Sequence, residues 1–313
     1  MKKYAFGADI GGTTVKLGLF TTEGELLEKW EIPTRTGAEF DILKDVAASC
    51  REMMGQKALS EEDFAGIGIG VPGPVRADGS VDVCVNLGWG RKQVRDEIEA
   101  ALGMPAAVGN DANVAALGEM WQGGGKGYEN VVMVTLGTGV GGGIIVDGKV
   151  ISGAHGCGGE IGHMTINTHE TETCNCGKKG CLEQYASATG IVRMAKKALA
   201  ESDEDTVLRK VDTLTAKDVM DAARFGDAFA LRLLEDFARR LARGLSFISC
   251  VTDPDIFVIG GGVSKAGEII TEAVERHFQN FVFSGQKQTK FGLATLGNDA
   301  GIYGCAKLII ETA

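Results

Sequence analysis

The feature that most constrains the fold of this chain is a pair of similar glycine-rich segments. Residues 4–20 read as an apolar strand, a glycine turn and a second strand, with a third strand following through Trp30, and residues 131–151 repeat this three-strand scheme. The 46 glycines among 313 residues gather in short loops and do not follow a collagen-like repeat. The duplication predicts two α/β lobes, each with a glycine-tipped hairpin directed at a shared cleft.

Amphipathic stretches between and after the hairpins predict helices, and short apolar runs predict further buried strands. The predicted helices cover roughly residues 41–57, 91–102, 112–121, 186–201, 217–224, 227–250 and 301–310, and the added strands cover 66–71 and 255–259. A chain of 313 residues is long enough for two domains. A two-lobed enzyme is therefore the expected architecture.

Two other glycine-loop folds are excluded by the residues around the loops. Gly137, Gly139 and Gly142 match the dinucleotide pattern G-x-G-x-x-G, but a dinucleotide turn must open a helix, and residues 144–146 continue as a strand. The P-loop pattern G-x-x-x-x-G-K-[ST] does not occur. Backbone amides of a glycine hairpin can approach an anion closely, because no Cβ blocks the approach. The hairpins are therefore predicted to hold phosphates.

Charge and apolar content exclude several classes of partner. The net charge is −10, from 32 Lys and Arg against 42 Asp and Glu, so the overall field repels nucleic acid and anionic membranes. No apolar run approaches the length of about 18 residues that a membrane span needs. The first strand follows directly after residues 1–3, without the features of a signal peptide. We expect a cytoplasmic protein that binds neither nucleic acid nor membrane.

A group of cysteines with one histidine predicts a metal site. His163, Cys174, Cys176 and Cys181 form the spacing H-x10-C-x-C-x4-C, while the remaining cysteines are scattered singly. Three thiolates and one imidazole complete the tetrahedral shell of Zn²⁺ and leave no position for water, so the predicted zinc is structural. The alternative is a set of unliganded thiols in the core. If one ring nitrogen of His163 binds zinc, the other is a fixed donor for a substrate.

Six segments together resemble the ROK family, which contains sugar kinases and transcriptional repressors. They are DIGGTTVK at 9–16, GVPGPV at 70–75, NLGW at 86–89, GNDANVAALGE at 109–119, G-E-I-G-H at 159–163 and C-N-C-G-x-x-G-C-x-E at 174–183. The resemblance extends over essentially the whole chain and is closest to the bacterial ATP-dependent ROK glucokinases.

The resemblance implies a fold and a division of the chain. The fold is the actin-like ATPase fold, related to ribonuclease H, in which paired hairpins grip the nucleotide phosphates. Residues 1–112 and 296–313 would form a small lobe and residues 113–295 a large lobe, with the helix at 301–310 packed back on the small lobe. A homodimer is expected.

The implied reaction is transfer of the γ-phosphoryl group of ATP to the 6-hydroxyl of glucose. N-Acetylmannosamine, N-acetylglucosamine and fructose stay open as alternative hexoses, because the shape of the loops near Gly73 and Asn86 determines selectivity. A sugar-sensing repressor is less favoured, since the first strand begins at Tyr4 and leaves no room for an N-terminal helix-turn-helix.

The resemblance also implies the residues that bind the sugar, and their chemistry agrees, because carboxylates and amides are good partners for hydroxyls. The six implied positions are Gly73, Asn110, Asp111, Glu160, His163 and Glu183. Asp111 would be the catalytic base that receives the proton of the 6-hydroxyl. Its alternative role is to cap the helix that follows, and for Glu160 and Glu183 the alternative is a solvated surface carboxylate.

The implied ATP contacts lie in both hairpins and in a third glycine run at 260–262. They are Asp9, Gly11, Gly12, Thr13, Thr14, Lys16, Thr138, Gly139, Gly261 and Gly262. Asp9 ends the first strand, where it would hold Mg²⁺ through water. The run at 260–262 would lie beneath the adenosine and precede a helix that begins near Ser264. The structural alternative for each segment is an ordinary tight turn.

Overall fold

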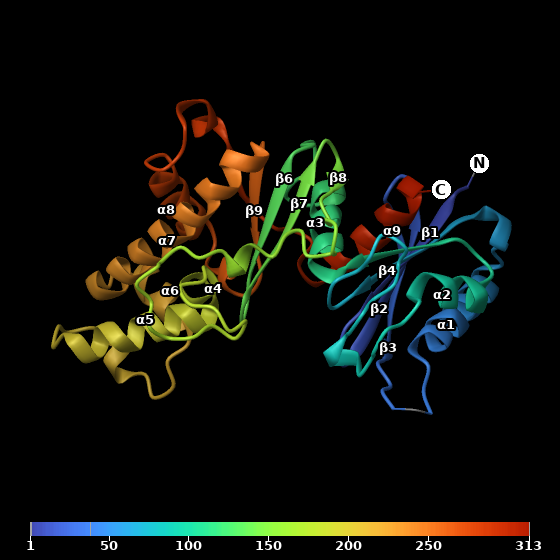
Figure 1. The fold of residues 1–313 in the computed structure, drawn as a ribbon, viewed down its shortest axis with the longest axis horizontal. Coiled ribbons are helices and arrows are strands. Elements are labelled where there is room, and N and C mark those ends of the chain that lie inside the picture. Colours follow the sequence, from blue (N-terminus) through green and yellow to red (C-terminus); the bar gives the residue numbers. More distant parts are fainter. Residues whose placement is uncertain (1, 38, 313) are drawn as a thin grey trace.

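The computed structural model describes residues 2–37 and 39–312, which form two α/β lobes (Figure 1). The strands are β1 (Tyr4–Ile10), β2 (Thr14–Thr21), β3 (Leu26–Pro33), β4 (Phe64–Val71), β5 (Ala106–Asn110), β6 (Val131–Leu136), β7 (Val140–Val146), β8 (Lys149–Val150), β9 (Ile256–Gly260) and β10 (Lys290–Leu293). The α-helices are α1 (Ile42–Lys57), α2 (Val94–Leu102), α3 (Asp111–Gln122), α4 (Glu183–Ala186), α5 (Ala188–Glu201), α6 (Ala216–Arg224), α7 (Ala228–Thr252), α8 (Glu268–Phe278) and α9 (Ala300–Thr312).

The two sheets share one pairing scheme, which confirms the predicted duplication. Their strand orders are β3-β2-β1-β4-β5 and β10-β9-β6-β7-β8. In the first sheet β1 pairs antiparallel with β2 and parallel with β4. In the second, β6 pairs antiparallel with β7 and parallel with β9. Each glycine-tipped hairpin therefore lies beside a parallel strand, and each lobe has one such hairpin.

Apolar cores hold each sheet against its helices. In the small lobe Phe6 stacks on Phe64 with ring centroids 4.6 Å apart, and residues of α1 and α2 complete the cluster. In the large lobe α7 buries apolar residues at helical spacing, among them Phe237, Leu241 and Leu245. No helix in residues 2–37 and 39–312 combines the length and the apolar character that crossing a bilayer requires.

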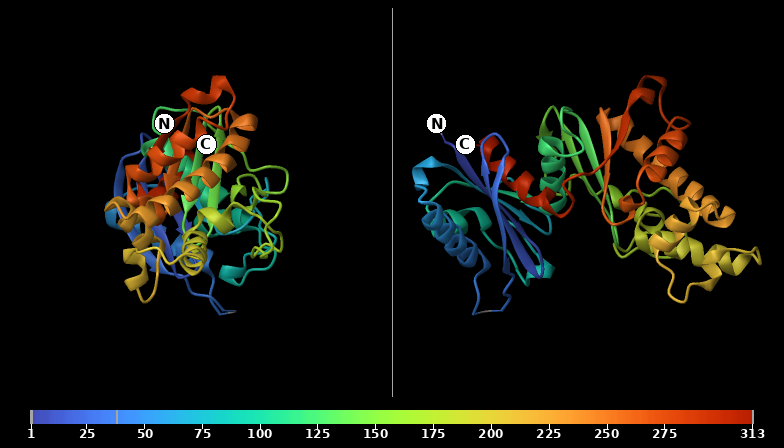
Figure 2. Two further views of the ribbon diagram at one scale, coloured as in Figure 1. Left: turned by 90° about the vertical axis from the view of Figure 1, so that its left-hand side faces the viewer. Right: turned by 180° about the vertical axis from the view of Figure 1, so that it is seen from behind.

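The helix α9 covers the other face of the small-lobe sheet, as predicted. It packs so closely that a Cβ at Gly68 of β4 would lie 1.7 Å from the carbonyl oxygen of Cys305. It also packs along α3, where a Cβ at Gly304 would lie 1.6 Å from the carbonyl oxygen of Val114. Figure 2 shows α9, in red, between the small-lobe sheet and α3. The contact of α3 with α9 therefore forms the joint between the lobes.

The structure corrects three details of the predicted elements. The helix expected over 186–201 begins two residues later, at Ala188, because Ser187 is the N-cap of α5, and residues 183–186 form a separate short helix, α4. The helix expected from Ser264 begins at Glu268, because residues 263–266 form a 3₁₀ turn that ends at Gly267, whose φ is +80°. The strand β10 was not predicted; it is short and extends the second sheet by pairing with β9.

Candidate active site

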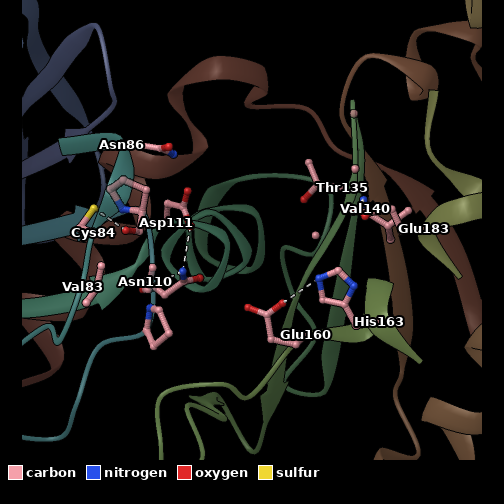
Figure 3. A pocket seen from close by; sticks show the side chains of 16 residues that line it. Val83, Cys84, Asn86, Asn110, Asp111, Thr135, Val140, Glu160, His163 and Glu183 are labelled. Atoms are coloured by element: carbon pink, nitrogen blue, oxygen red, sulfur yellow. Dashed lines mark hydrogen bonds and ion pairs between the residues drawn. The ribbon is translucent and has the colours of Figure 1, made fainter. Parts of the chain in front are cut away.

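A cleft with a volume of about 760 Å³ is lined by loops of both lobes (Figure 3). This volume lies within the range of small-molecule sites. All six predicted sugar positions are among its lining residues, which are Pro72, Gly73, Pro74, Val83, Cys84, Asn86, Asn110, Asp111, Thr135, Gly137, Gly139, Val140, Gly141, Glu160, His163 and Glu183. The structure therefore brings together residues that are more than one hundred positions apart in the sequence.

Asn110 organises the small-lobe side of the cleft. It is the N-cap of α3, and its Oδ1 accepts hydrogen bonds from the amides of Ala112 and Asn113. Its Nδ2 donates to the carbonyl oxygen of Gly73 at 3.1 Å and to Oδ1 of Asp111 at 2.9 Å. The capping role considered for Asp111 thus belongs to Asn110, which also fixes the neighbouring loop and carboxylate.

Asp111 is the first residue of α3, and its carboxylate faces the cleft (Figure 3). Burial raises the pKa of this carboxyl, and the Glu160 carboxylate raises it further. Hydrogen bonds from the amide of Ala112 and from the side chain of Asn110 oppose the rise. A carboxylate with a raised pKa is a better proton acceptor than an ordinary surface carboxylate, which suits a general base.

The first hairpin supplies a second carboxylate close to Asp111. Burial raises the pKa of Asp9 to about 6, the charge of Asp111 raises it as well, and the Lys16 ammonium lowers it. Asp9 lies opposite Lys16 in the β1–β2 register, and Lys16 Nζ donates to the carbonyl oxygen of Asn298 at 3.0 Å. None of the described residues at positions 2–16 lines the cleft in this conformation.

The tip of the first hairpin has a tight, internally bonded backbone. The amide of Gly11 donates to the carbonyl oxygen of Thr14 at 3.0 Å, and Thr34 Oγ1 donates to the carbonyl oxygen of Gly11 at 2.7 Å. Gly12 and Thr13 are exposed at the tip. Because hydrogen bonds fix the backbone of the tip and its outer residues are exposed, the amides at the tip can bind an anion.

On the large-lobe side, Glu160 and His163 face the cleft from one short segment. His163 Nε2 lies 3.9 Å from Glu160 Oε2, and His163 Nδ1 lies 3.9 Å from the sulfur of Cys174. The two ring nitrogens therefore point in different directions, one toward the cleft and the other toward the cysteines. This orientation agrees with the double role expected for His163.

Glu183 joins three parts of the large lobe. Its Oε2 accepts a hydrogen bond from the amide of Val140, just after the tip of the second hairpin, at 3.1 Å. Its Oε1 lies 3.6 Å from the sulfur of Cys174, and a Cβ at Gly139 would lie 2.3 Å from its Oε2. Glu183 is therefore no freely solvated surface carboxylate, because it braces the second hairpin against the cysteine cluster.

The four predicted metal ligands lie together. Their donor atoms, one from each of His163, Cys174, Cys176 and Cys181, are all within 4.8 Å of one another. The sulfurs of Cys176 and Cys181 are 3.6 Å apart. Ligands at tetrahedral zinc with Zn–S bonds of about 2.3 Å are roughly 3.8 Å from one another. The donor set and its spacing therefore fit a tetrahedral metal ion.

The second hairpin and the run at 260–262 lie on one side of the large lobe. Gly139 lines the cleft, and the Thr138 carbonyl oxygen accepts a hydrogen bond from Thr189 Oγ1 at 2.8 Å. Gly261 has φ of +86°, and a Cβ there would lie 2.5 Å from the carbonyl oxygen of Leu136, so glycine is required. Gly262 lines a separate cavity of about 480 Å³ beside α6.

Several lining residues were not predicted as site residues, among them Val83, Cys84 and Thr135. The sulfur of Cys84 lies 2.7 Å from the carbonyl oxygen of Pro72 and donates to it, which ties down the loop before Gly73. Thr135 carried a usable signal, since it is the one polar residue in the strand VVMVTL and precedes the glycine turn. The sequence around Val83 and Cys84 held no such signal, because an irregular loop brings these residues to the cleft.

Comparison with known proteins agrees with this geometry. The ROK family model matches residues 5–312. A glucokinase from Halalkalibacterium halodurans is 42% identical, with 98% of this chain and 95% of that protein covered. An N-acetylgalactosamine kinase from a Shewanella species is 32% identical over 97% of each chain.

Among solved structures, a ROK family glucokinase from Streptomyces griseus in complex with glucose and AMPPNP has a TM-score of 0.73 and 34% identity. The alignment covers 97% of this chain and 98% of that one. These likenesses, with the two sheets described above, confirm the predicted two-lobed actin-like ATPase fold. The chain belongs to the ROK family.

Proposed function

We propose that this protein is an ATP-dependent glucokinase that phosphorylates the 6-hydroxyl of glucose. The observation that carries the proposal is the meeting of Asn110 and Asp111 from the small-lobe side with Glu160, His163 and Glu183 from the large-lobe side of one cleft. The likeness to a glucokinase at 42% identity supports glucose as the acceptor. Carboxylates, an amide and an imidazole suit an acceptor that presents a ring of hydroxyls.

Asp111 acts as the general base. Its carboxylate accepts the proton of the 6-hydroxyl as the oxygen attacks the γ-phosphorus and the bond to the bridging oxygen breaks to release ADP, while Asn110 holds one carboxylate oxygen in place. The raised pKa of Asp111 favours proton acceptance. Glu160, His163 and Glu183 hydrogen-bond the other hydroxyls and fix the direction of attack. A sugar that lacks one of these hydroxyls leaves a buried group unpaired, at a cost of about 1–3 kcal/mol.

ATP lies along the glycine-rich loops. The tips at 11–14 and 137–139 donate backbone amides to the phosphates, and the cavity beside Gly262 receives the adenosine. Lys16 is positioned to turn from Asn298 toward a phosphate. Asp9 would hold Mg²⁺ through water, and the metal would neutralise charge on the phosphates.

His163, Cys174, Cys176 and Cys181 would hold a structural Zn²⁺. These ligands would use the metal to fix the segment that carries His163 and Glu183, with Nδ1 of His163 as a ligand and no part in the reaction itself. With Nδ1 bound, Nε2 is left as the nitrogen that faces the cleft and donates to a sugar hydroxyl.

Closure of the lobes brings sugar and ATP together. We place the boundaries between the lobes near residues 112 and 295. The buried Glu119 carboxylate supports this hinge, since it accepts hydrogen bonds from the amides of Gly124, Thr295 and Leu296. It anchors the chain where it returns to the small lobe. Closure excludes water and so limits wasteful hydrolysis of ATP.

We also propose a homodimer, supported by apolar side chains exposed one turn apart on α7. Phe247 is 43% exposed and Val251 is 85% exposed. Light scattering of the purified protein measures the assembly directly. A monomer at micromolar concentration would contradict this part of the proposal.

The reaction is tested with ATP and a panel of glucose, N-acetylmannosamine, N-acetylglucosamine, N-acetylgalactosamine and fructose. Glucose should give the highest kcat/KM, and phosphorus NMR of the product should show a 6-phosphate. A higher kcat/KM for any of the other sugars would replace glucose as the proposed acceptor. The Asp111→Asn variant is the control for contaminating kinases, because it should keep the fold and lose turnover.

A further inference from the structure

Thr135 is a polar residue that lines the cleft. It is the only polar side chain on β6 and lies one position before the end of the strand. It lines the main cleft and a smaller cavity of about 390 Å³ behind Asp111. Figure 3 shows its side chain pointing into the cleft, with no hydrogen bond to the other residues drawn.

The neighbouring strands leave the Thr135 hydroxyl uncovered. In the sheet register its partner on β7 is Gly141 and its partner on β9 is Gly260. Side chains opposite one another in a sheet normally lie close enough to touch. Gly141 and Gly260 carry no side chain, so neither paired residue covers the hydroxyl of Thr135, which is half-buried and lines the cleft.

Thr135 in the second hairpin can be compared with Asp9 in the first. Thr135 lies two residues before Gly137, as Asp9 lies two residues before Gly11. On the parallel strand Asp9 also faces a glycine, Gly70, as Thr135 faces Gly260. Thr135 therefore occupies in the second hairpin the place that Asp9 occupies in the first.

We propose that the Thr135 hydroxyl donates a hydrogen bond to a non-bridging oxygen of the γ-phosphoryl group during transfer. This inference rests on the proposed kinase function and assigns one more residue to that reaction. Thr135 lines the same cleft as Asp111, where the sugar oxygen attacks, and as the glycines of the second hairpin, where phosphates bind. The hydroxyl is neutral, so it can donate to an anion without the repulsion that a second carboxylate would bring.

The competing explanation is that a β-branched residue at this position only stabilises the strand. Two substitutions separate the explanations. Thr135→Val keeps the shape and the β-branching but removes the hydroxyl, whereas Thr135→Ser keeps the hydroxyl and removes a methyl group. The control Thr271→Val removes a hydroxyl that bonds within α8, outside the cleft.

The experiment measures kcat, KM and melting temperature of these variants with the hexose that the wild type phosphorylates fastest. Thr135→Val should lower kcat by roughly 10- to 100-fold, as expected for a hydrogen bond to a charged group in the transition state. The KM for the hexose should change little, and Thr135→Ser should keep most of the turnover. The Thr271→Val control should keep wild-type kcat.

A second readout replaces ATP with its γ-thio analogue, which puts sulfur at a non-bridging position. Sulfur accepts hydrogen bonds weakly, so the ratio of turnover with ATP to turnover with the analogue should be smaller in Thr135→Val than in the wild type. An unchanged ratio, or a Thr135→Val variant with more than half of wild-type kcat, overturns the assignment of Thr135 alone. A wild type that phosphorylates no hexose overturns the proposed function as well.

Discussion

The two glycine hairpins share one backbone plan but differ in the groups they carry. In the first, β1 and β2 are paired up to Ile10 and Val15, and the charged residues Asp9 and Lys16 face each other one step back from the turn. In the second, Leu136 and Val140 close the paired strands, and the equivalent step back holds Thr135 opposite Gly141. The first hairpin is charged at this position and the second is neutral.

The hairpins also differ in what holds them. The first is coupled to the reaction centre through electric charge, since Asp9 and Asp111 lie close enough for the charge of Asp111 to raise the pKa of Asp9. The second is coupled through a brace, because Glu183 binds the amide just after its tip and contacts the cysteine cluster. The same backbone arrangement thus positions charged groups in the first hairpin and is fixed by Glu183 in the second.

Substitution of Asp111 should have the largest effect. Asp111→Asn removes the proton acceptor and should lower kcat by roughly 10²–10⁴. The fold should be retained, since Asn110 caps α3. By contrast, Asn110→Ala should lower stability by about 1 kcal/mol through loss of the cap. Steady-state kinetics and melting curves measure both, and an Asp111→Asn variant with a tenth of wild-type kcat would contradict the base role.

The charge of the first hairpin should appear as pH-dependent stability. The pKa of Asp9 is about 6 in the folded protein, above the ordinary 3.8, so the folded state holds this proton more tightly than the unfolded chain. The free energy of unfolding should therefore fall as pH rises from about 4 to 6. Asp9→Asn should be more stable than the wild type above pH 6, by at most about 3 kcal/mol.

Urea unfolding without Mg²⁺ and without ATP, at pH 4.5 and pH 7.5, measures this difference. Asp205→Asn, which changes an exposed carboxylate, is the matched control. If Asp9→Asn is no more stable than the wild type at pH 7.5, the charged Asp9 carboxylate does not destabilise the folded protein. The difference in charge between the hairpins then has no effect on stability.

Loss of the predicted metal should affect the second hairpin and spare the first. Removal of zinc with a chelator, or Cys176→Ala, should weaken sugar binding by roughly 10- to 100-fold, because outer contacts of a metal site orient its ligands. Hydrogen exchange should become faster at Val140, whose amide donates a hydrogen bond to Glu183, and stay unchanged at Gly11. Purified protein without zinc that binds glucose normally would contradict the metal's role.

The smallest effect is expected on β3, the edge strand beside the first hairpin. Lys29 Nζ pairs with Asp299 at 2.7 Å, and both side chains are partly exposed. Surface pairs contribute about 0–1 kcal/mol and are screened by salt. Lys29→Ala should therefore lower stability less than loss of the α3 cap does and leave kcat unchanged. A larger loss, measured by urea unfolding in low and high salt, would mean that this pair fixes the segment leading into α9.

Much of the fold and of the site follows from the sequence because glycine turns and apolar runs are local signals. Both hairpins, and the meeting of Asp111 with Glu160 and His163, were predicted on that basis and from the family resemblance. The cap of α3 could not be assigned, because Asn and Asp cap helices about equally well and Asn110 and Asp111 are neighbours. Only the backbone geometry decides that Asn110 is the cap.

The remaining gaps come from contacts that are distant in sequence. The strand β10 is short, and it is stabilised by pairing with β9, more than thirty residues earlier in the sequence. Cys84 reaches the cleft on an irregular loop, whose path no periodic pattern reports. Thr135 could be read as one polar residue in an apolar strand, but its uncovered position depends on the register of two neighbouring strands.

The position of α9 has a consequence for how the protein is made on the ribosome. One face of the small-lobe sheet is buried by Ile302, Ala306 and Ile309, which contact Ala5 and Phe20 near the start of the chain. That face stays bare until residue 309 has left the exit tunnel, so the first lobe to be synthesised is the last to be completed. Nascent chains therefore expose this apolar sheet face until α9 has emerged, and chaperone binding should be strongest before that point.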